Sequence, residues 1–227
     1  MVQNLFKSIV KKRKTSFMKR AFAILTAAVA VGAMSCSKEP LNNLTPEESR
    51  IYVTNHDSTT NFNSYKTYNL ADSVAVVENG YATKELTATD QAYKDAVDKY
   101  MQQRGYTKVS KDQSPDLAVT VNRIYNTSSG IVTYGDYYDY YGGYWDPYYW
   151  GYSGYNYYVP YAYSIYEITE GAISVDMLDL KDATGSGNKI SLIWNGLIRG
   201  EDIFNASVAD AQVKALFDQS GYLQTSN

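Results

Sequence analysis

The sequence predicts an α+β fold: an antiparallel or mixed β-sheet with two amphipathic helices packed on one face. Three observations lead to this prediction. Short β-branched runs recur along the chain, two stretches have helical periodicity, and a tyrosine- and glycine-rich segment interrupts the series. The predicted order is strand, strand, helix, strand, strand, insert, strand, strand, helix.

The first elements are two strands and a helix. Residues 51–54 are rich in β-branched side chains, which predicts a strand, and residues 61–68 are typical of a turn followed by a strand. Residues 89–104 have one apolar stripe at three- and four-residue steps, which predicts the first helix. Thr87 or Thr89 is positioned to cap its start, and Gly105 suits the left-handed residue that ends many helices.

The next strands are predicted at 106–109 and at 117–124. In the longer one, Leu117, Val119 and Val121 fall on one face and Thr120 and Asn122 on the other. The pattern predicts one buried face and one wetter face, which favours antiparallel pairing.

The last elements are a hairpin and a helix. Apolar residues alternate in 173–177 and again in 190–198, with a glycine-rich turn at 182–188 between them. The second helix is predicted from four residues on one face, capped by Asp202 or Asn205 and ended by Gly221; the four are Ala209, Val213, Leu216 and Phe217.

The insert, residues 134–166, contains fifteen tyrosines together with Trp145 and Trp150, and has no regular period. We expect it to loop out between two core strands. Three interpretations stay open: rings that stack on sugars or peptides, an association element, or a mobile loop of biased composition. For the first interpretation, the candidate ligand-binding residues are Tyr144, Trp145, Tyr148, Tyr149 and Trp150.

The amino-terminal region is typical of a secretory signal. Lys19 and Arg20 precede an apolar run at 21–33 that is too short for a membrane-spanning helix, and small residues lead to Cys36. We therefore predict a signal peptide at 1–35, in which 1–17 reflects either a start assigned too early or a long charged leader. A lipidated tether at 36–50 and a single domain at 51–223 follow.

The stretch Ala33-Met34-Ser35-Cys36 resembles the lipobox of bacterial lipoproteins. This resemblance implies that Cys36 carries fatty acids such as palmitate, which would anchor the chain to a membrane. Ser37, in place of aspartate, implies the outer membrane, with the domain facing the periplasm or the cell surface. A secreted protein without an anchor and a free core cysteine are the alternatives.

The charge of the chain excludes some partners. It has 21 Lys and Arg and 24 Asp and Glu, and seven of the cations but none of the acids precede Cys36. From Cys36 onward the balance is 14 against 24, a net charge of −10. An acidic surface argues against nucleic acid as a partner. With one cysteine, no disulfide forms within the chain.

Catalytic and metal-binding patterns are scarce. His56 is the single histidine and has no serine-nucleophile motif beside it. Asp176, Asp179 and Asp182 recur at three-residue steps, which alternate faces on a strand and do not converge on a metal. We predict no enzymatic activity, no metal and no cofactor.

Three stretches together resemble the lipoprotein family called domain of unknown function 4136, common in Gram-negative bacteria, including Bacteroidota-type species. They are residues 61–68, residues 115–119, and residues 170–176 with 192–196. The resemblance implies a small α+β domain behind a lipid anchor, without a known activity. We therefore expect a cell-envelope lipoprotein with a noncatalytic structural or binding role. Its partners would be the membrane and a glycan or another envelope protein; a glycan- or peptidoglycan-binding module that uses the insert is the alternative.

Overall fold

The computed structural model describes residues 44–78, 81–125, 132–133, 145–160, 164–165 and 171–225. The chain divides into two compact units, Met1–Leu44 and Thr45–Asn227, and the fold below is that of the second unit. The predicted signal peptide, Cys36 and Tyr144 lie outside the described residues. Helix α2, Pro46–Ser49, is a single turn that Thr45 caps in the part predicted to be tether.

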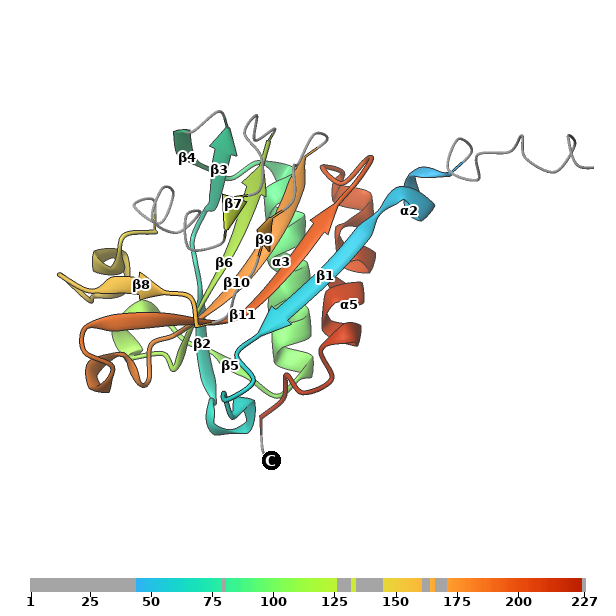
Figure 1. Ribbon diagram of the computed structural model, residues 1–227. Coiled ribbons are helices and arrows are strands. Elements are labelled where there is room, and N and C mark those ends of the chain that lie inside the picture. The colour runs from blue at the N-terminus through green and yellow to red at the C-terminus, as the bar shows by residue number, and fades with distance from the viewer. Residues whose placement is uncertain are drawn as a thin grey trace, which may run out of the picture. The chain divides into compact units, whose positions relative to one another are not determined.

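A nine-stranded mixed sheet forms the centre of the unit, in the order β1-β11-β10-β6-β2-β5 (Figure 1). The other three of the nine strands lie off this path: β3 pairs with β6 and β4, and β8 pairs with β11. The bounds are β1 Ile51–His56, β2 Thr67–Leu70, β3 Val74–Glu78, β4 Tyr81–Glu85, β5 Thr107–Lys108, β6 Leu117–Ile124, β8 Asn156–Tyr158, β10 Ala172–Asp179 and β11 Lys189–Arg199. A separate two-stranded ribbon joins β7, Val132–Thr133, to β9, Ser164–Ile165.

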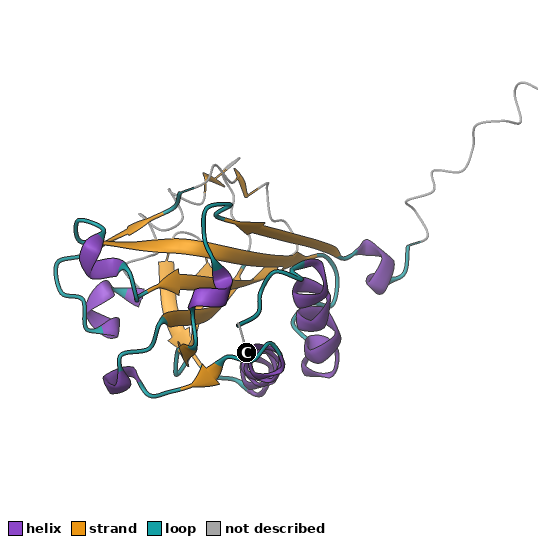
Figure 2. Ribbon diagram, turned by 90° about the horizontal axis from the view of Figure 1, so that it is seen from below, coloured by secondary structure: helices purple, strands orange, loops and turns teal. Residues whose placement is uncertain are grey.

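Both long helices cover one face of the sheet, as predicted (Figures 1 and 2). Helix α3 spans Ala88–Gln103, and Thr87 caps it by accepting a hydrogen bond from the amide of Asp90. Helix α5 spans Ala209–Gln219 and follows a 3-10 turn that Asn205 caps. The core beneath them contains large buried side chains from both helices and the sheet, among them Tyr68, Tyr93, Met101, Trp194 and Phe217.

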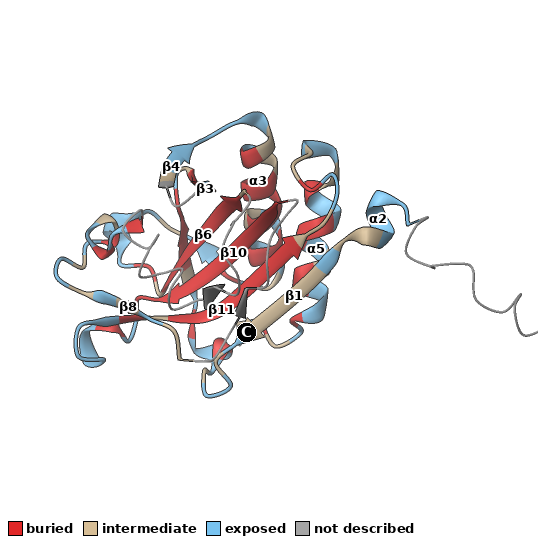
Figure 3. Ribbon diagram, turned by 45° about the horizontal axis from the view of Figure 1, so that its top comes forward, coloured by how far each residue is buried: buried red, intermediate tan, exposed pale blue. Residues whose placement is uncertain are grey.

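The opposite face of the sheet is also buried, and the prediction of a wetter face is wrong. Figure 3 shows β6, β10 and β11 buried along their central parts, whereas the edge strand β1 is only partly buried. A second core lies on this face, with Ala118, Leu178 and Leu192 from the sheet and Trp145 and Trp150 from the insert. The aromatic residues shield from water a face that the strand pattern alone would leave exposed.

The hairpin β3–β4 was not predicted. Strands β2 and β3 both run parallel to β6, one beside each half of it, and β4 pairs antiparallel with β3. The sequence does carry a hairpin signal here, because Asn79-Gly80 separates two runs that contain β-branched residues. Within the described ranges, no helix has both the length and the apolar character to span a membrane.

Candidate functional site

The aromatic segment, defined here as residues 145–158, packs on the second face of the sheet. It contains a 3-10 helix, Pro147–Trp150, and strand β8, which pairs in parallel with the start of β11. The carboxylate of Asp146 caps the 3-10 helix by accepting from the amide of Tyr148 at 2.8 Å. The expectation that the whole insert loops out is therefore wrong for this segment.

Two tryptophans hold the aromatic segment to the sheet. Trp145 and Trp150 are 4% and 5% exposed, and the ring of Tyr149 contacts both of them edge-on, with centroids 4.9 and 4.6 Å apart. Edge-to-face pairs of this kind add about 0.5–1.5 kcal/mol each to the gain from apolar burial. The segment lacks a regular apolar stripe, and its few large aromatic side chains provide the buried surface instead.

A buried polar network joins the aromatic segment to three strands. The indole N–H of Trp145 donates to Oδ1 of Asn122 on β6 at 3.1 Å. The side-chain amides of Asn122 and Asn195 donate to the two carboxylate oxygens of Asp176 at 2.9 and 2.6 Å. Asp176 is 0% exposed. A buried carboxylate is tolerated only where donors replace its water, and the two amides supply them.

This network accounts for Thr120 and Asn122, the two polar residues that the sequence pattern assigned to a wetter face. Thr120, Asn122 and Ser174 are all buried, and the amide of Asn122 also donates to the Ser174 hydroxyl at 3.0 Å. No sequence periodicity separates a buried, hydrogen-bonded asparagine from a solvated one. One signal in the sequence could have indicated this burial. The tyrosine-rich insert contains two tryptophans, and such large apolar side chains need a surface on which to pack.

The five predicted ligand-binding residues have different surroundings. Tyr148 is 72% exposed and Tyr149 is half-buried, whereas Trp145 and Trp150 belong to the second core. Tyr144 lies outside the described residues. Ligand binding by these five residues stays a prediction, and the rings that a ligand can reach in the aromatic segment include Tyr148 and Tyr158.

Tyr149 lies at the border between the second core and the surface. Its hydroxyl accepts a hydrogen bond from the Asp72 amide at 3.2 Å, and burial raises its pKa to about 12. The ammonium of Lys111 lies 3.6 Å from its ring centroid, and that of Lys84 lies 5.1 Å away. Burial raises the pKa of Asp72, but hydrogen bonds from Ser73 and Tyr149 and the two lysine charges outweigh this and lower it.

The other candidate groups do not assemble into a catalytic site. His56 is exposed at the end of β1 and stacks on Tyr222, with ring centroids 4.1 Å apart. Asp176 and Asp179 are buried, and Asp182 is exposed. Burial raises the pKa of Asp179, which accepts from the Asp182 amide at 3.0 Å. In the part of the chain that is described, no three acidic, histidine or cysteine side chains gather closely enough to hold a metal ion.

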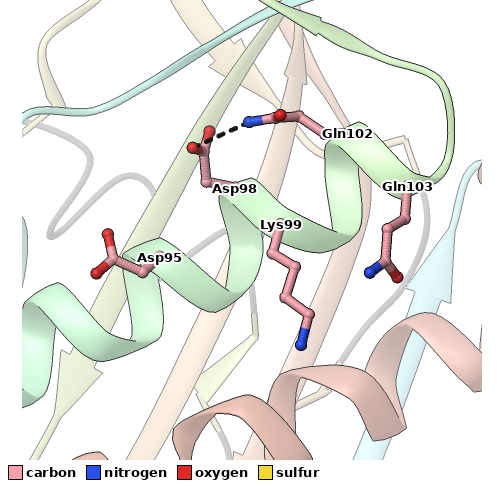
Figure 4. Close-up of a pocket in the computed structure, with 5 residues that line it drawn as sticks. All are labelled: Asp95, Asp98, Lys99, Gln102 and Gln103. Atoms are coloured by element: carbon pink, nitrogen blue, oxygen red, sulfur yellow. Dashed lines mark hydrogen bonds between the residues drawn. The ribbon is translucent and has the colours of Figure 1, made fainter.

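A surface pocket on α3 also lacks a convergent set of groups. Figure 4 shows its five lining side chains pointing in different directions from the helix: Asp95, Asp98, Lys99, Gln102 and Gln103. Gln102 donates to Asp98 at 3.1 Å, and Lys99 pairs with Asp210 of α5 at 2.7 Å. The first contact lies within α3 and the second joins α3 to α5, so Asp98 and Lys99 already have partners. The aromatic segment is therefore the candidate site.

One solved structure supports the fold. A crystal structure of a DUF4136 family protein from Bacteroides thetaiotaomicron is similar to this chain, with a TM-score of 0.65 and 26% sequence identity; the match covers 78% of this chain and 98% of the other. The PelC dodecamer from Paraburkholderia phytofirmans gives a TM-score of 0.39 at 8% identity, covering 78% of this chain and 99% of that one. No curated protein was found to match. The family described as domain of unknown function (DUF4136) matches residues 52–221, and the chain belongs to this family.

Proposed function

We propose that this protein is a lipid-anchored lipoprotein of the bacterial cell envelope with a noncatalytic structural or binding role. The observation that carries the proposal is the single cysteine, Cys36, placed directly after a charged and apolar leader. The folded unit described above begins at Thr45, which follows Cys36 in the sequence. Two or more fatty acids on one residue are sufficient for stable attachment to a bilayer.

Metabolic labelling tests the anchor. Cells that express the protein and are fed radioactive palmitate should yield a labelled wild-type band and an unlabelled Cys36→Ala band. Cys36→Ala should also move from the membrane fraction to the soluble fraction. Equal labelling of the two proteins, or an unmodified thiol at residue 36 in mass spectra of the native protein, would contradict the proposal.

A second candidate function is glycan binding, and the exposure of Tyr148 favours it. A tyrosine ring that is 72% exposed, in the same 3-10 helix as the buried Trp150, offers a flat surface on which a sugar ring can stack. In this function the aromatic segment would be both a structural layer and a binding surface. Outer-membrane attachment would place it near envelope polysaccharides.

The glycan proposal predicts that Tyr148→Ser lowers retention of the protein on polysaccharide or peptidoglycan columns. Because Tyr148 is exposed, the same change should alter the free energy of unfolding by no more than about 0.5 kcal/mol. Leu44→Ser, at another exposed apolar residue, is the matched control and should leave retention unchanged. Unchanged retention of Tyr148→Ser would exclude this ring as the binding surface.

A further inference from the structure

Strand β1 lies at the border of the sheet, and one of its two sides pairs with β11 (Figure 1). The register with β11 runs without a bulge from Ile51 opposite Arg199 to His56 opposite Trp194. Among the described strands, none pairs with the other side of β1. The free edge of β1 is therefore six residues long.

The other border strands differ from β1 in ways that limit pairing between molecules. Strand β5 has two residues and β8 has three, whereas β4 is longer but carries Lys84 and Glu85. Short length, charged side chains, proline and bulges are the usual means of blunting a sheet edge. Strand β1, Ile-Tyr-Val-Thr-Asn-His, is long and straight in register and contains no lysine, arginine, acidic residue or proline. It is thus an edge that remains able to pair.

The backbone groups that β1 presents to a neighbour follow from one hydrogen bond. The amide of Asp57 donates to the carbonyl oxygen of Ile193 at 3.0 Å, which continues the register of β1 with β11 by one residue. Hydrogen-bonded pairs alternate along an antiparallel ladder. The amides and carbonyls of Tyr52, Thr54 and His56 therefore point away from β11, toward the free edge.

The two charged residues that bound this neutral strand already have partners within the chain. The Arg50 side chain is 4% exposed, with Nη2 3.4 Å from the Glu47 carboxylate and Nε donating to the Glu201 carbonyl at 3.2 Å. The Asp57 carboxylate accepts from the amide and hydroxyl of Thr59 at 2.9 and 2.8 Å. A strand that pairs with β1 therefore meets an uncharged edge along its whole length.

A second copy of this chain is the partner that such an edge suits. From Cys36 onward the chain has a net charge of −10, so two copies repel one another over most of their surfaces. A strand that pairs with its own copy about a twofold axis places like residues opposite or near one another, and like charges there would be destabilising. Strand β1 has none. Attachment of the copies to one bilayer, as proposed above, would also raise their effective concentration.

We propose that β1 pairs antiparallel with β1 of a second copy, with Thr54 opposite Thr54 and Tyr52 opposite His56. This register engages all three outward-facing residues, and each hydrogen-bonded pair exchanges two N–H···O bonds. It joins two nine-stranded sheets into one through an isologous interface. Threonine pairs and aromatic pairs are favourable across strands. The contact involves little more than one strand from each copy, so the dimer is weak in solution.

Sedimentation velocity of the full-length protein in detergent tests the proposal, and should show a monomer–dimer equilibrium as concentration rises. Thr54→Lys and Thr54→Glu each place like charges opposite one another and should raise the dissociation constant about fivefold or more. Mixing the two variants should restore a dimer, because opposite charges then meet. Thr83→Lys, the same change at an exposed threonine of β4, is the matched control and should dimerise as wild type does.

Thr54→Pro is a second variant, in case a charge at this partly buried position prevents folding. It removes an amide that points away from β11, a position where edge strands accept proline, and should weaken the dimer while β1 stays paired with β11. Thermal melting shows which variants are folded. In wild type, hydrogen exchange at the amides of Tyr52, Thr54 and His56 should slow as protein concentration rises.

Several results would overturn the proposal. They include a dimer that neither Thr54→Lys nor Thr54→Pro weakens, an equal loss in Thr83→Lys, and a mixture of the two charged variants that stays monomeric. Wild type that is monomeric at every concentration would also overturn it. Slow exchange of the three amides in that monomer would mean that another segment of the same chain covers β1, and fast exchange would leave the edge to a different protein.

Discussion

The two faces of the sheet are covered by different kinds of structure. On one face, α3 and α5 contribute apolar stripes, and the core beneath them contains rings such as Tyr93, Trp194 and Phe217. On the other face, the aromatic segment lies over a sheet surface that includes a buried carboxylate and two buried asparagines, Asp176, Asn122 and Asn195.

The difference shows two ways of making a layer. The helices satisfy their own backbone hydrogen bonds and present an apolar stripe to the sheet. Two polar contacts add to this packing, from Tyr68 of β2 to Asp98 and from Arg123 of β6 to Asp90. The aromatic segment has little regular structure, and its docking includes the hydrogen bond from Trp145 to Asn122 as well as ring packing. We expect the helix-covered face to depend mainly on volume and the other face to depend also on hydrogen-bond geometry.

The largest predicted effect comes from alkaline pH, because it acts on both faces at once. Burial raises the pKa of Tyr65, Tyr68, Tyr93 and Tyr106 on the helix side, and that of Tyr149 to about 12. Above about pH 10 the unfolded chain loses these protons while the folded chain keeps them, so stability falls as pH rises. The slope is about 1.4 kcal/mol per pH unit for each such tyrosine.

Urea unfolding at several pH values between about 8 and 11.5, with tyrosinate absorbance followed in parallel, checks this prediction. Tyr149→Phe and Tyr93→Phe should each make the alkaline fall in stability less steep, because each removes one tyrosine whose pKa is raised by burial. Ionisation of every tyrosine near pH 10 without loss of stability would show that neither face is closed to water.

The next effect concerns the helix-covered face alone. Phe217→Ala removes a ring that is buried against Trp194 and Tyr100, and should lower the free energy of unfolding by about 3–5 kcal/mol. Denaturant unfolding measures it. Leu86→Ala, at an exposed leucine, should change stability by no more than about 0.5 kcal/mol. Similar values for the two variants would mean that α5 does not pack as described.

The smallest of the three effects concerns the second face. Asp176→Ala leaves the amides of Asn122 and Asn195 without their carboxylate acceptor and should cost about 1–3 kcal/mol. Asp176→Asn keeps the volume and one acceptor and should cost less. The readouts are urea unfolding and the near-ultraviolet dichroism of Trp145, and Glu201→Ala at an exposed residue is the control. If Asp176→Ala had the same free energy of unfolding as wild type, the polar network would not contribute to stability.

The sequence was sufficient to predict the helix-covered half of the fold. The strand at 117–124 agrees with β6, and the hairpin at 173–198 corresponds to β10 and β11. The first helix was predicted within one residue at each end, and one of its two suggested caps, Thr87, is the one used. These successes share a cause: a regular period of apolar residues specifies such elements locally.

The other half could not be predicted in the same way. Whether Asn122 is wet or buried depends on Trp145, which lies in an aperiodic segment distant in the chain from Asp176 and Asn195. The approach of Lys84 to the ring of Tyr149 likewise depends on the path of the chain through β3 and β4, which the predicted order omitted. Lys94 has the sequence environment of an ordinary surface lysine on a helix, and only the tertiary structure shows its burial.

The parallel pairing of β8 with the start of β11 has a further consequence. Strand β1 pairs with the later part of β11, so the two short strands together occupy the outer side of the longest strand in the sheet. An open strand edge is a template for uncontrolled pairing between molecules. By occupying part of that edge, the aromatic segment removes the start of β11 as a template for pairing between molecules.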